Sequence, residues 1–444
     1  MSKDEIILTE DQQIIHDDIL KRIVDIVSNH KNYSKENRMF SIEGSAGMGK
    51  SVLTSFIVKS LADDYKIHVS TPTHKSLGVL NEMLKKNDLR GQIDTTTIHS
   101  YLKLSPKEDY ENGQLILEII PDSKVKKVDV LLIDEASMVG KSLYNFIDDA
   151  MNRGLVKCII WVSDKHQLDP VLDEINPIYN KDIHKYQLTK IIRQAEDNPI
   201  ITLANKFRKC IEHKIYPENA TIIKSIEDMK CKEIEIYNND NDFMNRYFNS
   251  EYKAVENLIV SYTNKYTNNL NKMIRNILIP DSDTYVLDEH LIFNTVHTKN
   301  KEVIHNNNET IKIKKIQKNY SDIYKMVYWD IEDYEGRYFK AVDINDWHIF
   351  DTEIQKLANA AMKEKDRNSK RIIWSEYFDL KNEYQKVSYT YACTVHKSQG
   401  SSVNEIFINL RELLRMRGSI SDVDFLKIMY VAVTRTKFNA IFLI

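Results

Sequence analysis

One eight-residue segment constrains the fold of this chain more than any other part of it. Residues 44–51 read Gly-Ser-Ala-Gly-Met-Gly-Lys-Ser and fit the pattern G-x-x-x-x-G-K-[S/T]. An apolar stretch at Met39–Glu43 precedes the segment and a helical pattern begins at Lys50, so we expect a strand, a tight loop and a helix in that order. Glycines let backbone amides curl around phosphate oxygens beside a helix N-terminus. The segment therefore predicts a phosphate-binding loop in an α/β fold, and a chance glycine-rich turn is the alternative.

Two adjacent carboxylates provide the second half of a nucleotide site. The apolar stretch Val130–Ile133 leads into Asp134 and Glu135, which we expect to face the phosphate loop. Asp134 is then a ligand of Mg²⁺, and Glu135 orients or deprotonates the attacking water. A solvated Asp-Glu pair after a strand is common, so this expectation depends on the loop upstream. The other expected ligands are Gly44, Ser45, Ala46, Gly47, Met48, Gly49 and Lys50 for the nucleotide, with Lys50 on the β- and γ-phosphates, and Ser51 for Mg²⁺.

The composition limits what such a nucleotide hydrolase can be. A length of 444 residues suggests about two to four domains. A net charge of −3 argues against a simple polycationic nucleic-acid binder, so a groove for nucleic acid must collect positive charge locally. The four cysteines form no CxxC pair and indicate buried thiols in a reducing compartment. Without an apolar leader or a run of about 20 apolar residues, we expect a cytoplasmic protein with no membrane partner.

Short strands and helices alternate in two blocks, which predicts two parallel sheets with crossover helices. The first block opens with an amphipathic helix at residues 10–30, capped by Thr9, whose buried face is expected to carry Ile14, Ile15, Ile19, Ile23 and Val27. Its further strands are expected at His68–Thr71, Val128–Asp134 and Cys158–Ser163. The second block is expected to contain Asn257–Tyr262, a helix at Lys265–Ile277, Ser388–Thr394, Glu405–Asn409, a helix at Val423–Thr434 and Ala440–Leu443.

Each block carries an insertion. In the first, Asn112-Gly113 separates a polar run from an apolar one within Leu104–Asp122, which predicts a β-hairpin with a type I′ turn. Because an isolated two-stranded ribbon is marginally stable, part of its apolar face should pack on the first block or on the second insertion. The second insertion, about residues 291–387, is expected to be mainly β, with strands at Thr310–Ile316, Tyr324–Trp329 and Gly336–Val342 and a charged helix near 352–368.

The order of the remaining motifs resembles that of a known family. Thr71–His74, Thr96–Ser100 and Ser163–Val171 follow strands of the first block, and Thr394–Gly400 and Tyr430–Thr436 close the chain. In this order they resemble the superfamily 1 helicases of the RecD-like subgroup, including a helicase of T-even bacteriophages, over nearly the whole chain. Supporting stretches are Leu8–Gln12, Thr263–Lys265 and Trp374–Phe378. Ser163 departs from the family, which usually has glycine there, and we expect little consequence from a residue so small.

The resemblance implies two RecA-like domains with ATP and Mg²⁺ in the cleft between them. Gln12 would read the adenine edge, Gln167 would sense the γ-phosphate, Arg193 and Arg435 would contact that phosphate from the second domain, and Gly400 would lie beside the nucleotide. A surface ion pair is the alternative for each arginine, and an ordinary polar residue for Gln12. The implied domains are 1–100 and 127–190 for the first RecA-like domain, 101–126 for the hairpin, 191–290 and 388–444 for the second RecA-like domain, and 291–387 for a β-rich, SH3-like insertion.

The resemblance also implies single-stranded and fork DNA as partners, 5′-to-3′ travel and a hairpin that separates strands. The expected DNA-binding residues are Thr73, His74, Thr97, His99, Asn264, Lys265, Trp374, His396 and Lys397. For Trp374, packing in the insertion or against another domain is the stronger alternative. A monomer should suffice, in the host cytoplasm if a phage encodes it, and a single-strand-binding protein or another replication protein is a candidate partner.

Two other functions fit the same residues. The chain could be a translocase that strips proteins from DNA and unwinds little. It could also be a replication or recombination subunit in which ATP switches binding and turnover is incidental. Travel in either direction is built on the same two-domain engine, so the residues alone do not fix the polarity.

Overall fold

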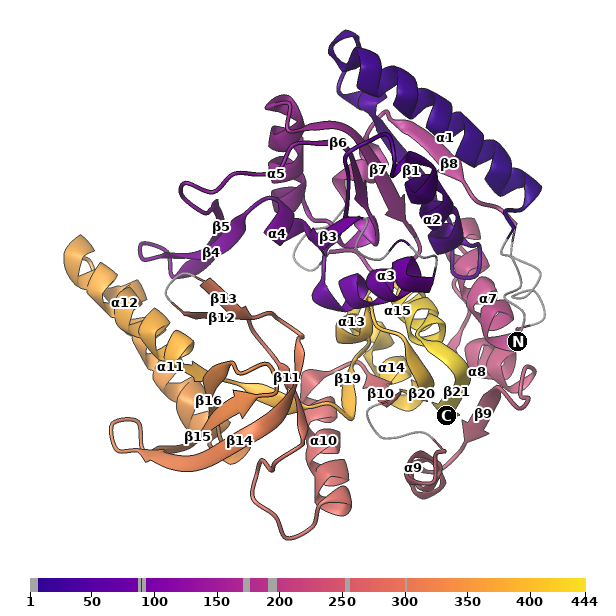
Figure 1. Cartoon of the computed structure of the whole chain (residues 1–444). Helices are drawn as coiled ribbons and strands as arrows, with labels where there is room; N and C mark the ends of the chain where they lie inside the picture. The colour runs from indigo at the N-terminus through magenta and orange to yellow at the C-terminus, as the bar shows by residue number, and fades with distance from the viewer. Residues whose placement is uncertain are drawn as a thin grey trace. The chain divides into compact units, whose positions relative to one another are not determined.

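The computed structural model describes residues 7–86, 89, 93–170, 176–190, 198–251, 256–299 and 302–444. The chain forms two compact units (Figure 1). The first contains Met1–Lys103, Lys124–Tyr262 and Thr394–Ile444, and the second contains Leu104–Ser123 and Thr263–Cys393. The hairpin segment therefore clusters with the residues inserted much later in the chain.

The first unit contains a parallel sheet, and the phosphate loop follows one of its inner strands. Its six strands have the order β3-β2-β6-β7-β1-β8, and all of its pairings are parallel. The strands are β1 (Met39–Glu43), β2 (Ile67–Thr71), β3 (Asp94–Thr97), β6 (Val128–Ile133), β7 (Val156–Ser163) and β8 (His184–Gln187). The helices are α1 (Glu10–Asn29), α2 (Lys50–Leu61), α3 (His74–Lys86), α4 (Ile98–Tyr101) and α5 (Lys141–Asn152).

A second parallel sheet completes this unit, which confirms the predicted α/β class. Its order is β19-β10-β20-β21-β9, with the unit boundary inside β19 (Ala392–Thr394). The other strands are β9 (Ile234–Tyr237), β10 (Asn257–Ser261), β20 (Val403–Asn409) and β21 (Thr436–Leu443). The helices are α7 (Pro199–His213), α8 (Asn219–Glu227), α9 (Asp240–Phe248), α13 (Val395–Ser398), α14 (Leu410–Met416) and α15 (Asp422–Thr434). Helix α15 is buried without interruption from Phe425 to Val433, so it belongs to the core.

Helix α1 begins where the sequence predicts. Thr9 and Gln12 form a capping box, in which the Thr9 hydroxyl accepts from the Gln12 N–H and the Gln12 side chain accepts from the Thr9 N–H. Ile19 and Ile23 are fully buried. Ile14, expected on the same face, is 65% exposed, and this part of the prediction is wrong. Within the described residues, no helix is long and apolar enough to cross a membrane.

The second unit is built on a largely antiparallel sheet with the order β17-β16-β15-β14-β11-β18. Its strands are β11 (His290–Phe293), β14 (Thr310–Ser321), β15 (Met326–Asp333), β16 (Tyr338–Val342), β17 (Tyr384–Gln385) and β18 (Val387–Tyr389), beside a small ribbon of β12 (His297–Lys299) and β13 (Glu302–His305). The helices are α10 (Asn264–Leu278), α11 (Trp347–Lys363) and α12 (Arg367–Glu383).

Two predictions for this region are wrong. The expected single helix near 352–368 is two helices, because Asp366 accepts a hydrogen bond from the Ser369 N–H and caps a new helix there. The expected strand Ser388–Thr394 is two short strands in different sheets, β18 and β19.

The hairpin pairs β4 (Leu104–Asp109) with β5 (Gln114–Ile119), in register from Leu104 opposite Ile119 to Asp109 opposite Gln114. The loop between them has four residues, and the Asp109 carboxylate accepts from the N–H groups of Glu111 and Asn112. Gly113 has φ +69° but Asn112 does not have a positive φ. The predicted two-residue type I′ turn is therefore wrong, although the hairpin itself is confirmed.

The hairpin is held by α12 of its own unit. The Tyr110 and Phe378 rings meet edge to face at 5.7 Å between centroids, and Asn382 Nδ2 donates to Glu108 at 2.5 Å. Trp374 covers Gly113 so closely that a Cβ there would lie 2.1 Å from Trp374 Cη2. These contacts come from the loop and the polar arm of the hairpin.

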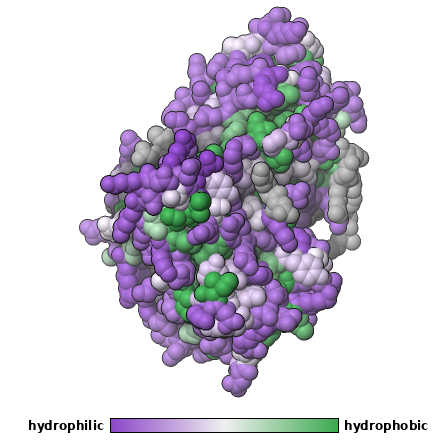
Figure 2. Space-filling model, turned by 90° about the vertical axis from the view of Figure 1, so that its left-hand side faces the viewer, coloured by the Kyte–Doolittle hydropathy of each residue, from purple (hydrophilic) through white to green (hydrophobic). Residues whose placement is uncertain are grey.

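The apolar arm is exposed near the loop. Leu115 and Ile116 are 52% and 45% exposed, whereas Leu117 and Ile119 further along the strand are partly buried. Figure 2 shows a face of the molecule that is mostly hydrophilic, with hydrophobic areas set apart from one another.

Candidate active site

The phosphate loop joins β1 to α2, as the sequence predicts. Gly49 takes a left-handed φ of 75° at the N-cap of α2, and Gly47 has φ 80°. Such backbone angles are unfavourable for residues with a Cβ, which explains the glycines. The expected Mg²⁺ ligand Ser51 lies in the first turn of α2. The loop therefore has the backbone geometry that a phosphate cradle needs.

Lys50 points back into the loop. Its Nζ donates to the carbonyl oxygens of Gly44 at 2.5 Å and Ser45 at 3.3 Å. It lies 4.0 Å from Oδ2 of Asp164, at the end of β7. The ammonium group is thus held at the mouth of the loop, where a nucleotide phosphate would contact it.

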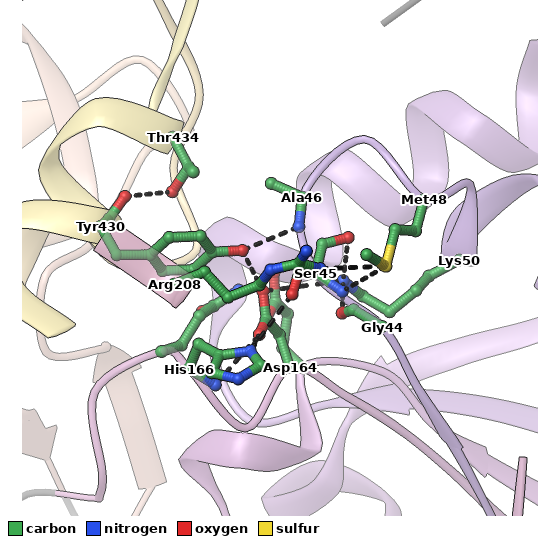
Figure 3. A network of polar contacts seen from close by, with 12 residues as sticks. Gly44, Ser45, Ala46, Met48, Lys50, Asp164, His166, Arg208, Tyr430 and Thr434 are labelled. Carbon is green, nitrogen blue, oxygen red and sulfur yellow. Dashed lines mark hydrogen bonds and ion pairs between the residues drawn. The ribbon is translucent and has the colours of Figure 1, made fainter. Parts of the chain in front are cut away.

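Asp164 is the centre of a polar network around the loop (Figure 3). The Tyr430 hydroxyl, from α15, donates to Asp164 Oδ2 at 2.6 Å and accepts from the Ala46 N–H at 2.8 Å. His166 donates its backbone N–H to Asp164 Oδ1 at 3.0 Å. Burial alone would raise the pKa of the Asp164 carboxyl, but the charge of Lys50 and hydrogen bonds from His166 and Tyr430 hold that pKa below its usual range. Asp164 is therefore a buried carboxylate that stays charged.

Further side chains join the network. His166 Nδ1 lies 3.1 Å from Ser45 Oγ, and its Nε2 lies 3.2 Å from a Glu212 oxygen on α7. Arg208, also on α7, brings its Nη1 to 3.9 Å from the Met48 sulfur. Sequence reasoning did not name Asp164, His166, Arg208 or Tyr430 as site residues. The first two and Tyr430 stand inside motifs that it did quote, whereas nothing in the sequence distinguishes Arg208 from other helical arginines.

The acidic pair follows β6. Glu135 takes a left-handed φ of 52° and donates its backbone N–H to Asp134 Oδ1 at 2.9 Å. Burial, with the charge of Glu135, raises the pKa of Asp134, while Lys50 opposes the rise. The influence of Lys50 on Asp134 indicates that the acidic pair and the loop lysine belong to one electrostatic site.

Gln12 also lies at the loop. Its Nε2 donates to the carbonyl oxygens of Met48 at 3.3 Å and Gly49 at 3.5 Å, and it is buried. The structure thus brings Gln12 to the loop backbone. Its expected contact with adenine stays a prediction.

The three residues expected to contact the γ-phosphate are Gln167, Arg193 and Arg435. Gln167 is buried, and its Oε1 accepts from Gln399 Nε2, at the end of α13, at 3.3 Å. Arg435 caps the C-terminus of α15 and donates to the Ser401 carbonyl oxygen at 3.5 Å, while its buried Nε has no hydrogen-bond partner. Arg193 lies outside the described residues. Gln167 and Arg435 therefore stand on the two sheets of the unit, and their roles stay predictions.

Threonines at strand ends mark the expected DNA-binding segments. Thr97, Thr263 and Thr394 each cap the helix that follows, as N-caps of α4, α10 and α13, and the Thr73 hydroxyl accepts from the Ser76 N–H in α3. Expected DNA contacts stand directly after these caps: His74, His99, Asn264, Lys265, His396 and Lys397. Asn264 and Lys265 belong to the second unit and the others to the first.

Two expected site residues are placed differently. Gly400, expected beside the nucleotide, lies where a Cβ would come within 2.5 Å of Ser76 Oγ and 3.2 Å of Thr73 Oγ1, so the structure puts it among the DNA-binding candidates. Trp374, expected to bind DNA, is 2% exposed beneath the hairpin and beside Tyr377. Its ring has no free face for a base, so the prediction of DNA binding by Trp374 is wrong and the packing alternative holds.

Comparison with known proteins finds relatives of the chain that carries this site. A family model described as an AAA domain matches residues 30–173, which contain the loop and the acidic pair. The chain is 25% identical to the ATP-dependent DNA helicase dda of Enterobacteria phage T4, over 93% of this chain and 96% of that protein. The chain is therefore similar to helicases of superfamily 1 over nearly its whole length. It is also 26% identical to the RecBCD enzyme subunit RecD of Buchnera aphidicola, over 51% of this chain and 42% of that protein.

A solved structure shares the fold of this chain. Bacteroides Pif1 bound to ssDNA aligns with a TM-score of 0.50 and 15% identity, over 99% of this chain and 92% of that one. At this identity the likeness concerns the fold alone. The resemblance inferred from the order of the motifs is thus confirmed by a relative that matches nearly the whole chain.

Glu135→Gln should separate nucleotide binding from chemistry at this site. The amide keeps the shape of the side chain but cannot accept a proton from water, so ATP should bind with little change while turnover falls about 100-fold or more. Fluorescent-nucleotide titration and phosphate release measure the two quantities. A folded variant that has lost ATP affinity would show that Glu135 does not act mainly on the attacking water.

Proposed function

We propose that this chain is an ATP-driven DNA helicase that moves 5′ to 3′ along single-stranded DNA and separates duplex strands. The observation that carries the proposal is the hydrogen bond from the Ala46 N–H, in the loop of the first sheet, to the Tyr430 hydroxyl on α15, in the second. A nucleotide at this loop would contact elements of both sheets. Hydrolysis could then change how the sheets approach each other, which is how a motor converts chemistry into steps.

ATP and Mg²⁺ suit the donors around the loop. The Asp134 carboxylate and the Ser51 hydroxyl are oxygen ligands of the kind that Mg²⁺ prefers. Because burial and the charge of Glu135 raise the pKa of Asp134, a divalent cation would favour its charged form. We propose that these two residues hold the ion, which would neutralise phosphate charge. Lys50 would bind the β- and γ-phosphates, and Glu135 would align the water.

Single-stranded DNA is proposed to cross the threonine-capped strand ends of the first unit. His74 and His396 are exposed there, and Lys397 is half-buried. Burial, with the charge of His74, lowers the pKa of His99, so this imidazole is neutral and suited to contact with bases. Lysines on phosphates and imidazoles on bases would bind DNA with little preference for sequence.

The hairpin is proposed to split the duplex. Its contacts with α12 at Gly113 and Tyr110 support this role, since a strand separator must resist the force of the advancing duplex. The exposed Leu115 and Ile116 offer an apolar edge against which unpaired bases could slide. The second unit as a whole would serve as the frame that keeps this edge rigid.

A comparison of tailed duplexes tests the proposal. A duplex with a 5′ single-stranded tail should be opened at least about tenfold faster than one with a 3′ tail, and ATP turnover should rise strongly with single-stranded DNA. Strand separation is followed by the fluorescence of a quenched label. Faster opening of the 3′-tailed duplex would contradict the proposed direction. An ATP turnover rate that does not change with single-stranded DNA would contradict the proposed motor function.

Two alternatives give different outcomes. A translocase that mainly strips proteins would displace a protein block from a labelled strand while leaving a forked duplex closed. A nucleotide-switched subunit would bind DNA differently with ATP and ADP while its turnover stayed low. A single-strand-binding protein is the proposed partner, because it would hold the strands that the helicase separates.

A further inference from the structure

We propose that Tyr430 is a positioning residue for ATP hydrolysis, whose hydroxyl fixes the phosphate loop and Asp164 relative to each other. The hydroxyl accepts from the Ala46 N–H at 2.8 Å and donates to Asp164 Oδ2 at 2.6 Å. No other described side chain bridges a loop amide and this carboxylate. The inference rests on the proposed ATPase function and adds a residue to its machinery.

The position of the tyrosine suits this role. Tyr430 is 1% exposed on the continuously buried face of α15, and its ring lies edge-on to His166 at 6.3 Å between centroids. Burial and the Asp164 charge raise the pKa of the phenol well above its usual range, so the group keeps its proton. A protonated phenol can donate to the carboxylate and accept from the amide at once.

The hydrogen bond from Tyr430 to Asp164 affects the position of the Lys50 ammonium group. Asp164 is a charged, buried carboxylate 4.0 Å from Lys50 Nζ. Without the phenol proton, the carboxylate would lose a donor and its negative charge would be less balanced. Lys50 would then be drawn towards Asp164 and away from the β- and γ-phosphates, because a buried charge takes the partners available to it.

The same residue ties the loop to the helix that carries the expected arginine. The Thr434 hydroxyl donates to the Tyr430 carbonyl oxygen at 3.0 Å, one turn further along α15, and Arg435 follows at the C-cap. Fixing Tyr430 against the loop therefore fixes the direction in which the end of α15 approaches it. Loss of the hydroxyl should slow the chemical step more than it weakens binding of the nucleotide.

Tyr430→Phe tests the proposal because it removes one oxygen and keeps the ring. We expect kcat for ATP to fall about 10- to 100-fold, the effect of losing one buried hydrogen bond to a charged group, while KM for ATP changes less than about threefold. Basal and DNA-stimulated turnover should fall alike. Tyr186→Phe is the matched control, since its hydroxyl also donates to a carboxylate, Asp18, at 2.6 Å but away from the loop. The control should lose stability and keep its kcat.

A double-mutant cycle with Asp164→Asn separates positioning from general destabilisation. If Tyr430 acts through Asp164, the loss of kcat in the double variant should be clearly smaller than the product of the two single losses. Parent-like kcat in folded Tyr430→Phe, a rise in KM at constant kcat, or independent single effects would each overturn the proposal. Failure of the proposed function is distinguishable, because the parent enzyme itself would then show no ATP turnover.

Discussion

Replacing Lys50 by alanine should lower ATP turnover by about 100- to 1000-fold, the range seen when one charge-stabilising group is removed from an active site. The Lys50 ammonium contacts the Gly44 and Ser45 carbonyl oxygens and lies 4.0 Å from Asp164, so it stands where the transferred phosphoryl group would develop charge. Without it, the phosphates would lose their fixed cation and would face the charged Asp164. DNA unwinding should be abolished with the turnover.

The fold should survive this change. The Lys50 side chain is 17% exposed and lies in the first turn of α2, where alanine is a good helix former. Lys59→Ala, at an exposed position of the same helix, is the matched control and should keep parent turnover. Phosphate release and thermal unfolding are the measurements. Near-parent turnover in folded Lys50→Ala would reject the assignment of the phosphate loop.

The second large effect is expected at the hairpin. Exchanging Asp109–Leu115 for a short Gly-Ser linker should abolish the opening of a forked duplex, while ATP turnover on single-stranded DNA stays near that of the parent. The linker removes the loop that packs on α12 but leaves every described residue of the phosphate loop in place. Strand separation and phosphate release, followed in the same reaction, measure both quantities. Normal unwinding by this variant would show that the hairpin does not split the duplex.

A single methyl group offers a finer version of this test. In Gly113→Ala, the new Cβ would lie 2.1 Å from Trp374 Cη2, so hairpin and helix must move apart. Gly336→Ala is the matched control, because Gly336 also has a positive φ, of 80°, but nothing lies within 4 Å of its Cβ position. Both variants incur the left-handed strain of about 1 to 2 kcal/mol, and only Gly113→Ala should slow unwinding. A smaller side chain at Trp374, combined with Gly113→Ala, should restore part of the rate.

The central strands of the parallel sheets could be predicted because they are short apolar runs between clear turn signals, whereas the edge strands β3 and β8 are polar and are not among the predicted strands. Met39–Glu43 is found with the predicted bounds, since the phosphate loop fixes where the strand ends. The hairpin turn was mistaken because Asn-Gly usually takes two positive φ angles, whereas here the Asp109 carboxylate organises a longer loop. The pattern near 352–368 predicts one helix because a single carboxylate, that of Asp366, sets where the second helix begins.

The sequence predicts those site residues whose role can be recognised from their immediate neighbours in the chain. Lys50 and Asp134 are recognisable from their neighbours, and they belong to one electrostatic site. Tyr430 was missed because its partners, Ala46 and Asp164, stand 384 and 266 residues away in sequence. The prediction that Trp374 binds DNA is wrong because its contact with Gly113 cannot be inferred from the neighbouring residues in the sequence. Contacts between distant segments are set by packing, which no local pattern encodes.

The clustering of the hairpin with the later insertion has a consequence for biosynthesis. Glu111 and its partner Arg367 are 256 residues apart. At about 5 to 20 residues per second, a ribosome would finish the hairpin roughly ten to fifty seconds before the helix that holds it. During that interval the ribbon lacks its contacts with α12 and is a marginal structure. Nascent chains stalled before residue 367 should therefore show the hairpin as open to protease, and released full-length chains should show it closed.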